Sequence, residues 1–135
     1  MSIHIVSEQE FCVGDQIEIE GEAPEGNFAV MFEDDGDTGY FYALDTSQTE
    51  QSIQDAVQIY NVANVTDRNK PSVVKIGWST DFRKAVLLIN GYPHAIFDFE
   101  DQQGYCRTGF PPAPNNGKWS AKGHAWNEAA VGLFA

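Results

Sequence analysis

An acidic segment, FEDDGDTGYFYALD at residues 32–45, combines residue types that could bind a metal or catalyse a reaction. As a calcium-binding EF-hand loop that begins at Asp34, it would place Gly36 and Thr38 at positions where oxygen-rich ligands are needed, and its flanks are strand-like instead of helical. Asp37 begins an Asp-Thr-Gly triplet like that of aspartic proteases. In those enzymes two buried carboxylates share a proton, whereas Asp37 follows a hydrated run of acids. The segment therefore predicts a polar hairpin turn with no catalytic residue and no specific metal motif, and loose binding of a divalent cation stays open.

The histidines and cysteines lie too far apart in the sequence to indicate a metal site. We expect no cofactor, and we expect a binding function more than an enzymatic one. The two cysteines are expected to be reduced, buried thiols in a cytoplasmic protein, although a single disulfide between them stays open. The histidines and cysteines of the chain are His4, Cys12, His94, Cys106 and His124.

Aromatic residues offer an alternative function, a small-ligand site or a weak hydrolase near His94. Ligand pockets are lined mainly by apolar and aromatic side chains with a few polar groups. The candidate pocket residues are Tyr40, Tyr42, Trp78, Tyr92, His94 and Tyr105.

The charge of the chain is unevenly distributed along the sequence. The net charge is -12, yet residues 1–67 contain 15 acids and no Lys or Arg, whereas the remainder contains five acids and eight bases. If this imbalance persists on the folded surface, its negative field attracts a basic protein partner. An acidic face that serves only solubility is the competing interpretation. Nucleic-acid binding is disfavoured because the basic residues are not clustered.

An acidic binding protein, such as an immunity-type protein or a regulatory inhibitor of a basic partner, is therefore the first functional hypothesis. The candidate partner-binding residues are Glu18, Glu20, Asp34, Asp35 and Asp37.

Apolar runs and alternating patterns predict about six strands in an antiparallel sheet. Asn90-Gly91 favours a tight turn between the last two of these strands, because both residues tolerate positive φ. The segment FPPAPNNGK at 110–118 is expected to be a surface loop, since its prolines lack backbone donors. The predicted strands are residues 15–22, 27–32, 40–44, 72–79, 84–90 and 94–100, the last three forming a meander.

Two helices complete the predicted fold. Ser52 is a suitable N-cap for a helix that places Ile53, Ala56, Val57 and Tyr60 at helical spacing. A second helix is expected in the C-terminal segment HAWNEAAVGLF, whose apolar residues gather near one helical face. The expected class is α+β, a mainly antiparallel sheet with about two helices packed on it.

Residues 1–135 are long enough for a single domain. No stretch approaches the roughly 20 apolar residues that span a bilayer, and the N-terminus has no signal-like pattern. We therefore expect a cytoplasmic protein with no membrane contact; the sequence leaves the oligomeric state open.

Several separated blocks resemble one protein family. They include FEDDG-x-TGYFYALD at residues 32–45 and INGYPHA-x-FDF at residues 89–99, and they fall in order between about residues 25 and 110. The blocks are similar to a family of small acidic bacterial proteins known only as a domain of unknown function. The resemblance implies a bacterial, cytosolic, stand-alone domain and brings no functional residues with it.

Overall fold

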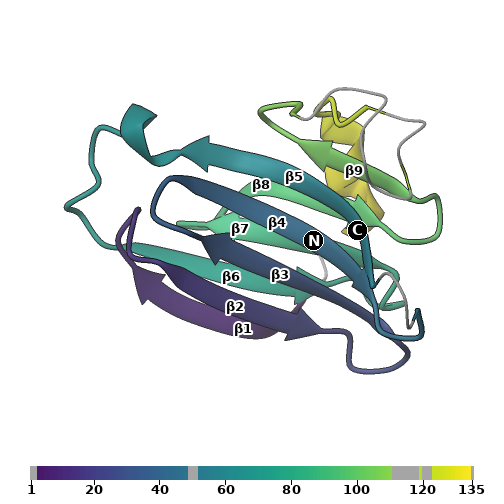
Figure 1. The fold of residues 1–135 in the computed structure, drawn as a ribbon. Helices are drawn as coiled ribbons and strands as arrows, with labels where there is room; N and C mark the ends of the chain where they lie inside the picture. The colour runs from purple at the N-terminus through teal and green to yellow at the C-terminus, as the bar shows by residue number, and fades with distance from the viewer. Residues whose placement is uncertain (1–2, 49–51, 111–118, 120–122, 135) are drawn as a thin grey trace.

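Two antiparallel β-sheets packed face to face form the body of the protein (Figure 1). The structure is a computed structural model that describes residues 3–48, 52–110, 119 and 123–134. The strands are β1 (His4–Phe11), β2 (Ile17–Glu22), β3 (Phe28–Asp34), β4 (Thr38–Asp45), β5 (Ile53–Asn61), β6 (Ser72–Trp78), β7 (Lys84–Ile89), β8 (Tyr92–Asp98) and β9 (Gln103–Cys106), and the 3-10 helices are η1 (Val62–Asn64) and η2 (Glu128–Phe134). One sheet has the order β1-β6-β7-β8-β9, and the other has the order β2-β3-β4-β5.

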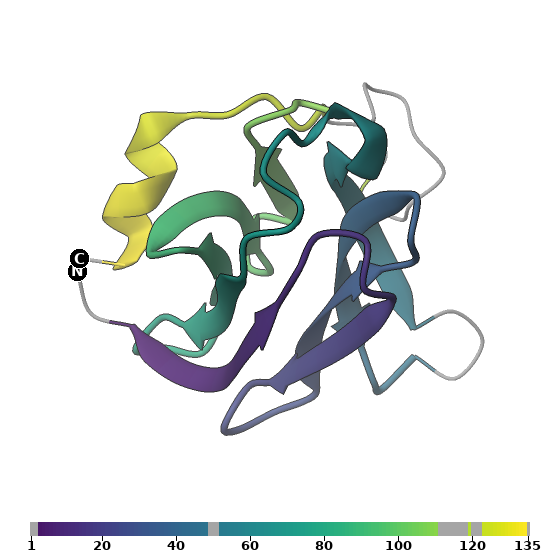
Figure 2. The ribbon, with the colours of Figure 1, turned by 90° about the vertical axis from the view of Figure 1, so that its left-hand side faces the viewer.

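The protein has three layers, which Figure 2 shows from the side: η2, the five-stranded sheet and the four-stranded sheet. Between the sheets, Phe41 of β4 stacks on Phe97 of β8 with ring centroids 5.0 Å apart. On the opposite face of the five-stranded sheet, Val86 and Ile96 pack against Phe134 of η2. Each face of the five-stranded sheet is thus covered by another element.

The predicted strands are present, and two turns follow the expected chemistry. Asn90 and Gly91 have φ values of 54° and 79°, which suits the tight turn between β7 and β8. The acidic segment forms the turn between β3 and β4, which pair in register. Strands β1 and β9 were not predicted. Apart from Phe110, the loop predicted at 110–118 lies outside the described residues.

The helix predicted from Ser52 is wrong, because residues Ile53–Asn61 form strand β5. Two register shifts in the pairing of β4 with β5 leave Ile59 and Gln54 without a paired residue. Each extra residue shifts by one position the alternation of side chains between the two faces of the sheet. The spacing of three between Val57 and Tyr60 therefore arises from a bulge and mimics a helical repeat.

The C-terminal segment is also not the predicted α-helix. Its helical part, Glu128–Phe134, is 3-10 helix and packs Ala130 and Phe134 against the five-stranded sheet. The fold class is consequently mostly antiparallel β, with two sheets, in place of α+β with two helices. The prediction failed because bulged strands and short apolar segments reproduce helical spacing over one or two turns.

Candidate functional site

The acidic turn between β3 and β4 uses its carboxylates to fix its own backbone. Oδ1 of Asp35 accepts hydrogen bonds from the amides of Asp37 and Thr38, both at 2.9 Å. The Thr38 and Asp37 amides hold the pKa of the Asp35 carboxyl below its usual range. The predicted turn is confirmed. The side chain of Asp35 stabilises the turn by accepting hydrogen bonds from backbone amides of the same turn.

Asp34 is buried and does not belong to the protein surface. Its exposed fraction is 1%. Its Oδ2 accepts hydrogen bonds from the Gly14 amide and the Tyr60 hydroxyl, both at 2.6 Å, and its Oδ1 accepts one from the Gly36 amide at 2.9 Å. A buried carboxylate with three donors holds the β3–β4 hairpin against β5 and the turn before β2. Asp35 and Asp37 are exposed at the tip of the hairpin.

Glu18 and Glu20 point outward from β2, on the face of the four-stranded sheet that lies away from the core. β2 alternates, so that Ile19 is buried while the glutamates on either side are exposed. Glu18 pairs directly with Glu33 of β3, which places two like charges opposite each other. Glu22 extends the same row, and these four residues are called the acidic row: Glu18, Glu20, Glu22 and Glu33.

An aromatic stripe lies beside the acidic row on the same face. Tyr40 and Tyr42 of β4 stack with ring centroids 6.0 Å apart, and Met31 of β3 pairs with Tyr42. The Tyr42 hydroxyl donates to Oε1 of Glu33 at 3.0 Å, and burial together with this carboxylate raises the pKa of Tyr42. The stripe is defined by Met31, Tyr40, Tyr42, Leu44 and Ala56.

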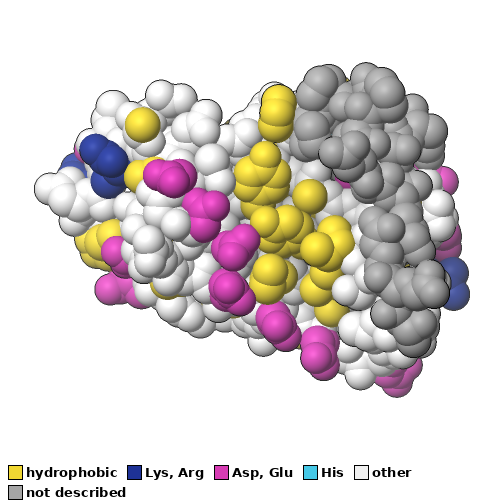
Figure 3. Space-filling model, viewed as in Figure 1, with side chains coloured by type: hydrophobic (Ala, Val, Ile, Leu, Met, Phe, Trp, Pro, Cys, Tyr) yellow, Lys and Arg dark blue, Asp and Glu magenta, His cyan; other side chains and the backbone are white. Residues whose placement is uncertain are grey.

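The acidic row and the aromatic stripe together form what we call the acidic–aromatic face. In Figure 3, a row of acidic side chains borders a hydrophobic stripe, and basic side chains lie toward the ends of the molecule. Neither core cluster of the described residues includes a side chain of the stripe. The face therefore offers half-buried aromatic surface next to aligned negative charge.

Four basic residues of the described chain are paired elsewhere. Lys75 pairs with Glu8, Arg83 with Glu100, Lys84 with Asp81 and Arg107 with Glu128. All four lie on the five-stranded sheet or its connections. Within the described ranges, no Lys or Arg forms an ion pair with the acidic row.

The residues of the alternative aromatic pocket are not brought together. Tyr40 and Tyr42 lie on the outer face of the four-stranded sheet, whereas Trp78 is fully buried between the sheets. Tyr105 packs in the cluster beneath η2, and Tyr92 is 53% exposed. His94 lies beside Tyr92, with ring centroids 5.7 Å apart, but the six residues form no common site.

Tyr92 instead takes part in a stacked cluster around Arg107. The guanidinium carbon lies 4.2 Å from the centre of the Tyr92 ring and 4.1 Å from the Trp126 ring. Nε of Arg107 donates to the Pro93 carbonyl at 2.7 Å, and Glu128 accepts from Trp126 Nε1 at 2.8 Å. These contacts attach the segment before η2 to β8.

A buried pair of Asp55 and His124 went unrecognised in the sequence. His124 Nε2 lies within 2.9 Å of both carboxylate oxygens of Asp55, and each side chain is 1% exposed. The residues are 69 positions apart, and Asp55 falls in the segment assigned to a helix, so no local signal could pair them. The pair is shielded from solvent, and it fixes the segment that contains His124 to β5.

Both cysteines are free thiols, but Cys12 is only partly buried, contrary to the expectation that both would be buried. Cys106 is buried, and its Sγ lies 3.2 Å from the carbonyl of Gln58. In the described part of the chain, no group of three His, Cys, Asp or Glu side chains is arranged to hold a metal ion.

Residues 11–135 match a family described as uncharacterized protein conserved in bacteria, DUF2251. The chain belongs to this family. An uncharacterized protein of Haemophilus influenzae is 46% identical over 94 residues, which cover 70% of this chain and 58% of that relative. The chain thus spans less than two thirds of the relative's length. No solved structure matches the chain.

The family match confirms the resemblance that the separated sequence blocks indicated. Neither the family description nor the name of the relative states an activity. As for membranes, the helices in the described residues are too short or too polar to cross a bilayer.

Proposed function

We propose that this protein is a non-enzymatic binding protein whose acidic–aromatic face docks a basic protein. The observation that carries the proposal is the alignment of four glutamates beside an aromatic stripe on one outward sheet face. Within this proposal, the protein acts as an immunity-type protein or a regulatory inhibitor of its basic partner. The buried, free Cys106 fits a reducing compartment, and we place the protein in the cytoplasm.

Electrostatics favours a basic partner for this face. Like charges placed directly opposite on neighbouring strands, as Glu18 and Glu33 are, destabilise the free protein. A Lys or Arg side chain of a partner that approaches the row relieves this repulsion and is attracted from a distance. Complementary charge of this kind mainly raises the rate of association and suppresses wrong partners.

The aromatic stripe supplies the short-range part of the contact. Tyrosine side chains are enriched among the residues that contribute most binding energy at protein interfaces. Tyr42 keeps its ring on the face while its hydroxyl is held by Glu33, so little conformational freedom is lost on binding. The acidic row therefore attracts a basic partner from a distance, and the aromatic stripe on the same face supplies the close contacts.

The proposal is tested with two variants that remove the same charge from different faces. Glu18→Gln with Glu20→Gln neutralises the centre of the acidic row, and Glu8→Gln with Glu10→Gln neutralises two exposed positions of β1. The immobilised proteins are incubated at low salt with extract of the bacterium that produces the protein, and captured basic proteins are identified and quantified. The binding constant of the captured protein is then measured for each variant.

We expect the row variant to weaken binding about tenfold, or ~1.4 kcal/mol, and the β1 variant to leave it nearly unchanged. Binding should also fall as salt rises, because exposed charges are screened. Equal losses in the two variants would show that net charge alone is responsible. Capture of no basic protein at low salt would contradict the proposal.

A further inference from the structure

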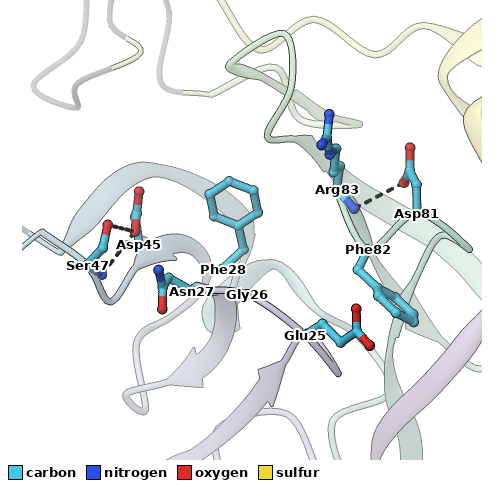
Figure 4. A pocket seen from close by; sticks show the side chains of 9 residues that line it. All are labelled: Glu25, Gly26, Asn27, Phe28, Asp45, Ser47, Asp81, Phe82 and Arg83. Carbon is cyan, nitrogen blue, oxygen red and sulfur yellow. Dashed lines mark hydrogen bonds between the residues drawn. The ribbon is translucent and has the colours of Figure 1, made fainter.

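A pocket of about 500 Å³ lies at one end of the sandwich, and none of its lining residues belongs to the acidic–aromatic face. It is formed where three connections meet: the β2–β3 turn, the end of β4 and the β6–β7 turn (Figure 4). Its volume falls within the roughly 300–1,000 Å³ of small-molecule sites in proteins. Shape alone does not select a ligand, so the chemistry of the walls decides.

Two phenylalanine rings supply the apolar walls of the pocket. In Figure 4, the Phe28 ring stands between Asp45 and Ser47 on one side and Arg83 on the other. The ring is fixed by stacking on Phe99, with centroids 4.5 Å apart. Phe82 is held in the β6–β7 turn by the hydrogen bond from its amide to the Ser79 carbonyl, and its ring contacts His4 at 5.4 Å between centroids. The aromatic walls are therefore in place before a ligand arrives.

Two of the charged groups at the pocket are already neutralised by neighbours. Arg83 Nη1 donates to Oε2 of Glu100 at 2.9 Å. Oδ2 of Asp81 accepts from Lys84 Nζ at 3.1 Å, while its Oδ1 accepts from the Ser79 hydroxyl at 2.6 Å. The hydrogen bond from Ser79 and the contacts with Lys84 lower the pKa of Asp81 to about 2, so it stays ionised within its own pair.

Two carboxylates remain with bonding capacity toward the pocket. Glu25 is exposed and forms no hydrogen bond or ion pair with another described residue. Among the described residues, the Asp45 side chain accepts hydrogen bonds only at Oδ1, from the amide and the hydroxyl of Ser47 at 3.0 Å and 2.6 Å. Its Oδ2 accepts no hydrogen bond from another described residue. The unneutralised charge of the lining is therefore negative.

We propose that this pocket binds a small organic cation with a flat apolar body, such as an aromatic amidinium or amine. Carboxylates and phenylalanine faces both attract a cation, and the hydrogen bonds between a charged donor and a carboxylate are among the stronger ones in proteins. The apolar body of the ligand fills the space between Phe28 and Phe82. This site is separate from the surface proposed for a basic protein and does not depend on it.

Three probes of nearly equal shape and different charge test the site. Benzamidine is cationic, benzamide is neutral and benzoate is anionic at neutral pH. Binding of each to the full chain is measured by calorimetry, and amide chemical shifts show where it binds. We expect benzamidine to saturate and to shift the amides of Glu25, Phe28 and Phe82, with benzamide and benzoate at least about tenfold weaker.

Variants then assign the charge recognition to two residues. Glu25→Gln and Asp45→Asn should each weaken benzamidine binding severalfold to tenfold, because each removes one charge and keeps an oxygen acceptor. Glu10→Gln, which removes one exposed charge on β1, should leave binding unchanged. Phe28→Leu should weaken benzamidine and benzamide alike, since it removes the aromatic wall without a change in charge.

The outcomes that overturn the proposal are specific. Benzoate that binds as tightly as benzamidine would show that Arg83 governs the pocket. A benzamidine affinity that is the same in wild type, Glu25→Gln and Asp45→Asn would remove the carboxylates from recognition. Failure of benzamidine to saturate the folded wild-type chain would exclude the site. The spectrum of each variant shows that it is folded.

Discussion

His124 Nε2 lies 2.9 Å and 2.8 Å from the two carboxylate oxygens of Asp55, and this contact joins strand β5 to the segment that precedes η2. Both side chains are 1% exposed, so water cannot replace either partner. The backbone reinforces the junction, since the Cys106 amide donates to the His124 carbonyl at 2.9 Å. The pair therefore holds the end of the chain to both sheets.

Removal of one partner of this pair should destabilise the protein. We expect Asp55→Ala or His124→Ala to lower the free energy of unfolding by about 3 kcal/mol, because a buried polar group loses its partner. Urea unfolding measures the loss. The double variant should lose less than the sum of the single variants by at least about 1 kcal/mol. Additive losses would mean that the two side chains do not stabilise each other.

Gly104 is expected to be required by the same pair. An added Cβ would lie 2.7 Å from Asp55 Oδ2 and 2.9 Å from His124 Cδ2, whereas no atom of the described residues lies within 4 Å of a Cβ at Gly132. Gly104→Ala should therefore cost about 2 kcal/mol of unfolding free energy, and Gly132→Ala should be within about 0.5 kcal/mol of wild type. Similar thermal stability of the two variants would contradict the packing around Asp55.

The Tyr60 hydroxyl should contribute to stability through Asp34. It donates to the buried carboxylate at 2.6 Å, and Tyr60→Phe leaves Asp34 with the amides of Gly14 and Gly36. We expect a loss of about 1–2 kcal/mol in the free energy of unfolding, measured by urea titration. Tyr92→Phe is the matched control, because Tyr92 is 53% exposed and should change stability little. A larger loss in the control would refute this role for Tyr60.

The stability of the protein should also fall in strong alkali because of Tyr60. Burial, followed by the hydrogen bond to Asp34, raises the pKa of Tyr60 above its usual 10. A raised folded-state pKa gives stability that is present below pH 10 and is lost as the pH rises above 10, since the unfolded chain releases its proton first. The slope of unfolding free energy against pH above 10 should decrease in Tyr60→Phe. An unchanged slope would assign the alkaline loss to other groups.

His94 should make the protein less stable in weak acid. Burial, and then the charge of Arg107, lowers the pKa of His94 below its usual 6.5. A lowered histidine pKa gives stability that is full above pH 6.5 and decreases as the pH falls toward the folded-state pKa, because the unfolded chain takes up the proton first. An NMR titration of the imidazole should give a midpoint below pH 6.5. His94→Gln should reduce the decrease in unfolding free energy below pH 6.5. A midpoint at or above 6.5 is the contrary result.

Local sequence was enough to predict most of the strands. Alternating glutamates and isoleucines define β2, and Asn90-Gly91 gives the turn of the meander because both residues adopt positive φ. The acidic turn between β3 and β4 was predicted for the same reason, since Asp and Gly stabilise turns by themselves. These features depend on residues that are neighbours in the sequence, so the sequence alone is enough to predict them.

Interactions between distant segments decided the rest. Strand β5 was mistaken for a helix because bulges opposite β4 set the spacing of its apolar residues, and bulges exist only when two strands pair. The acidic residues illustrate the same limit: Asp34 lies inside and Asp35 outside, although they are adjacent. Their burial differs because Gly14 and Tyr60, which are distant in the sequence, come within hydrogen-bonding distance of Asp34 only in the folded protein.

The sequence by itself determined the excess of acids in the first half of the chain, most of the strand-forming segments and the family. Only the tertiary structure decided which acids share a face with tyrosines and which are paired with bases. The physical reason is that side-chain alternation follows from the local backbone, whereas strand order, register and the pairing of Asp55 with His124 require segments up to 69 residues apart to meet.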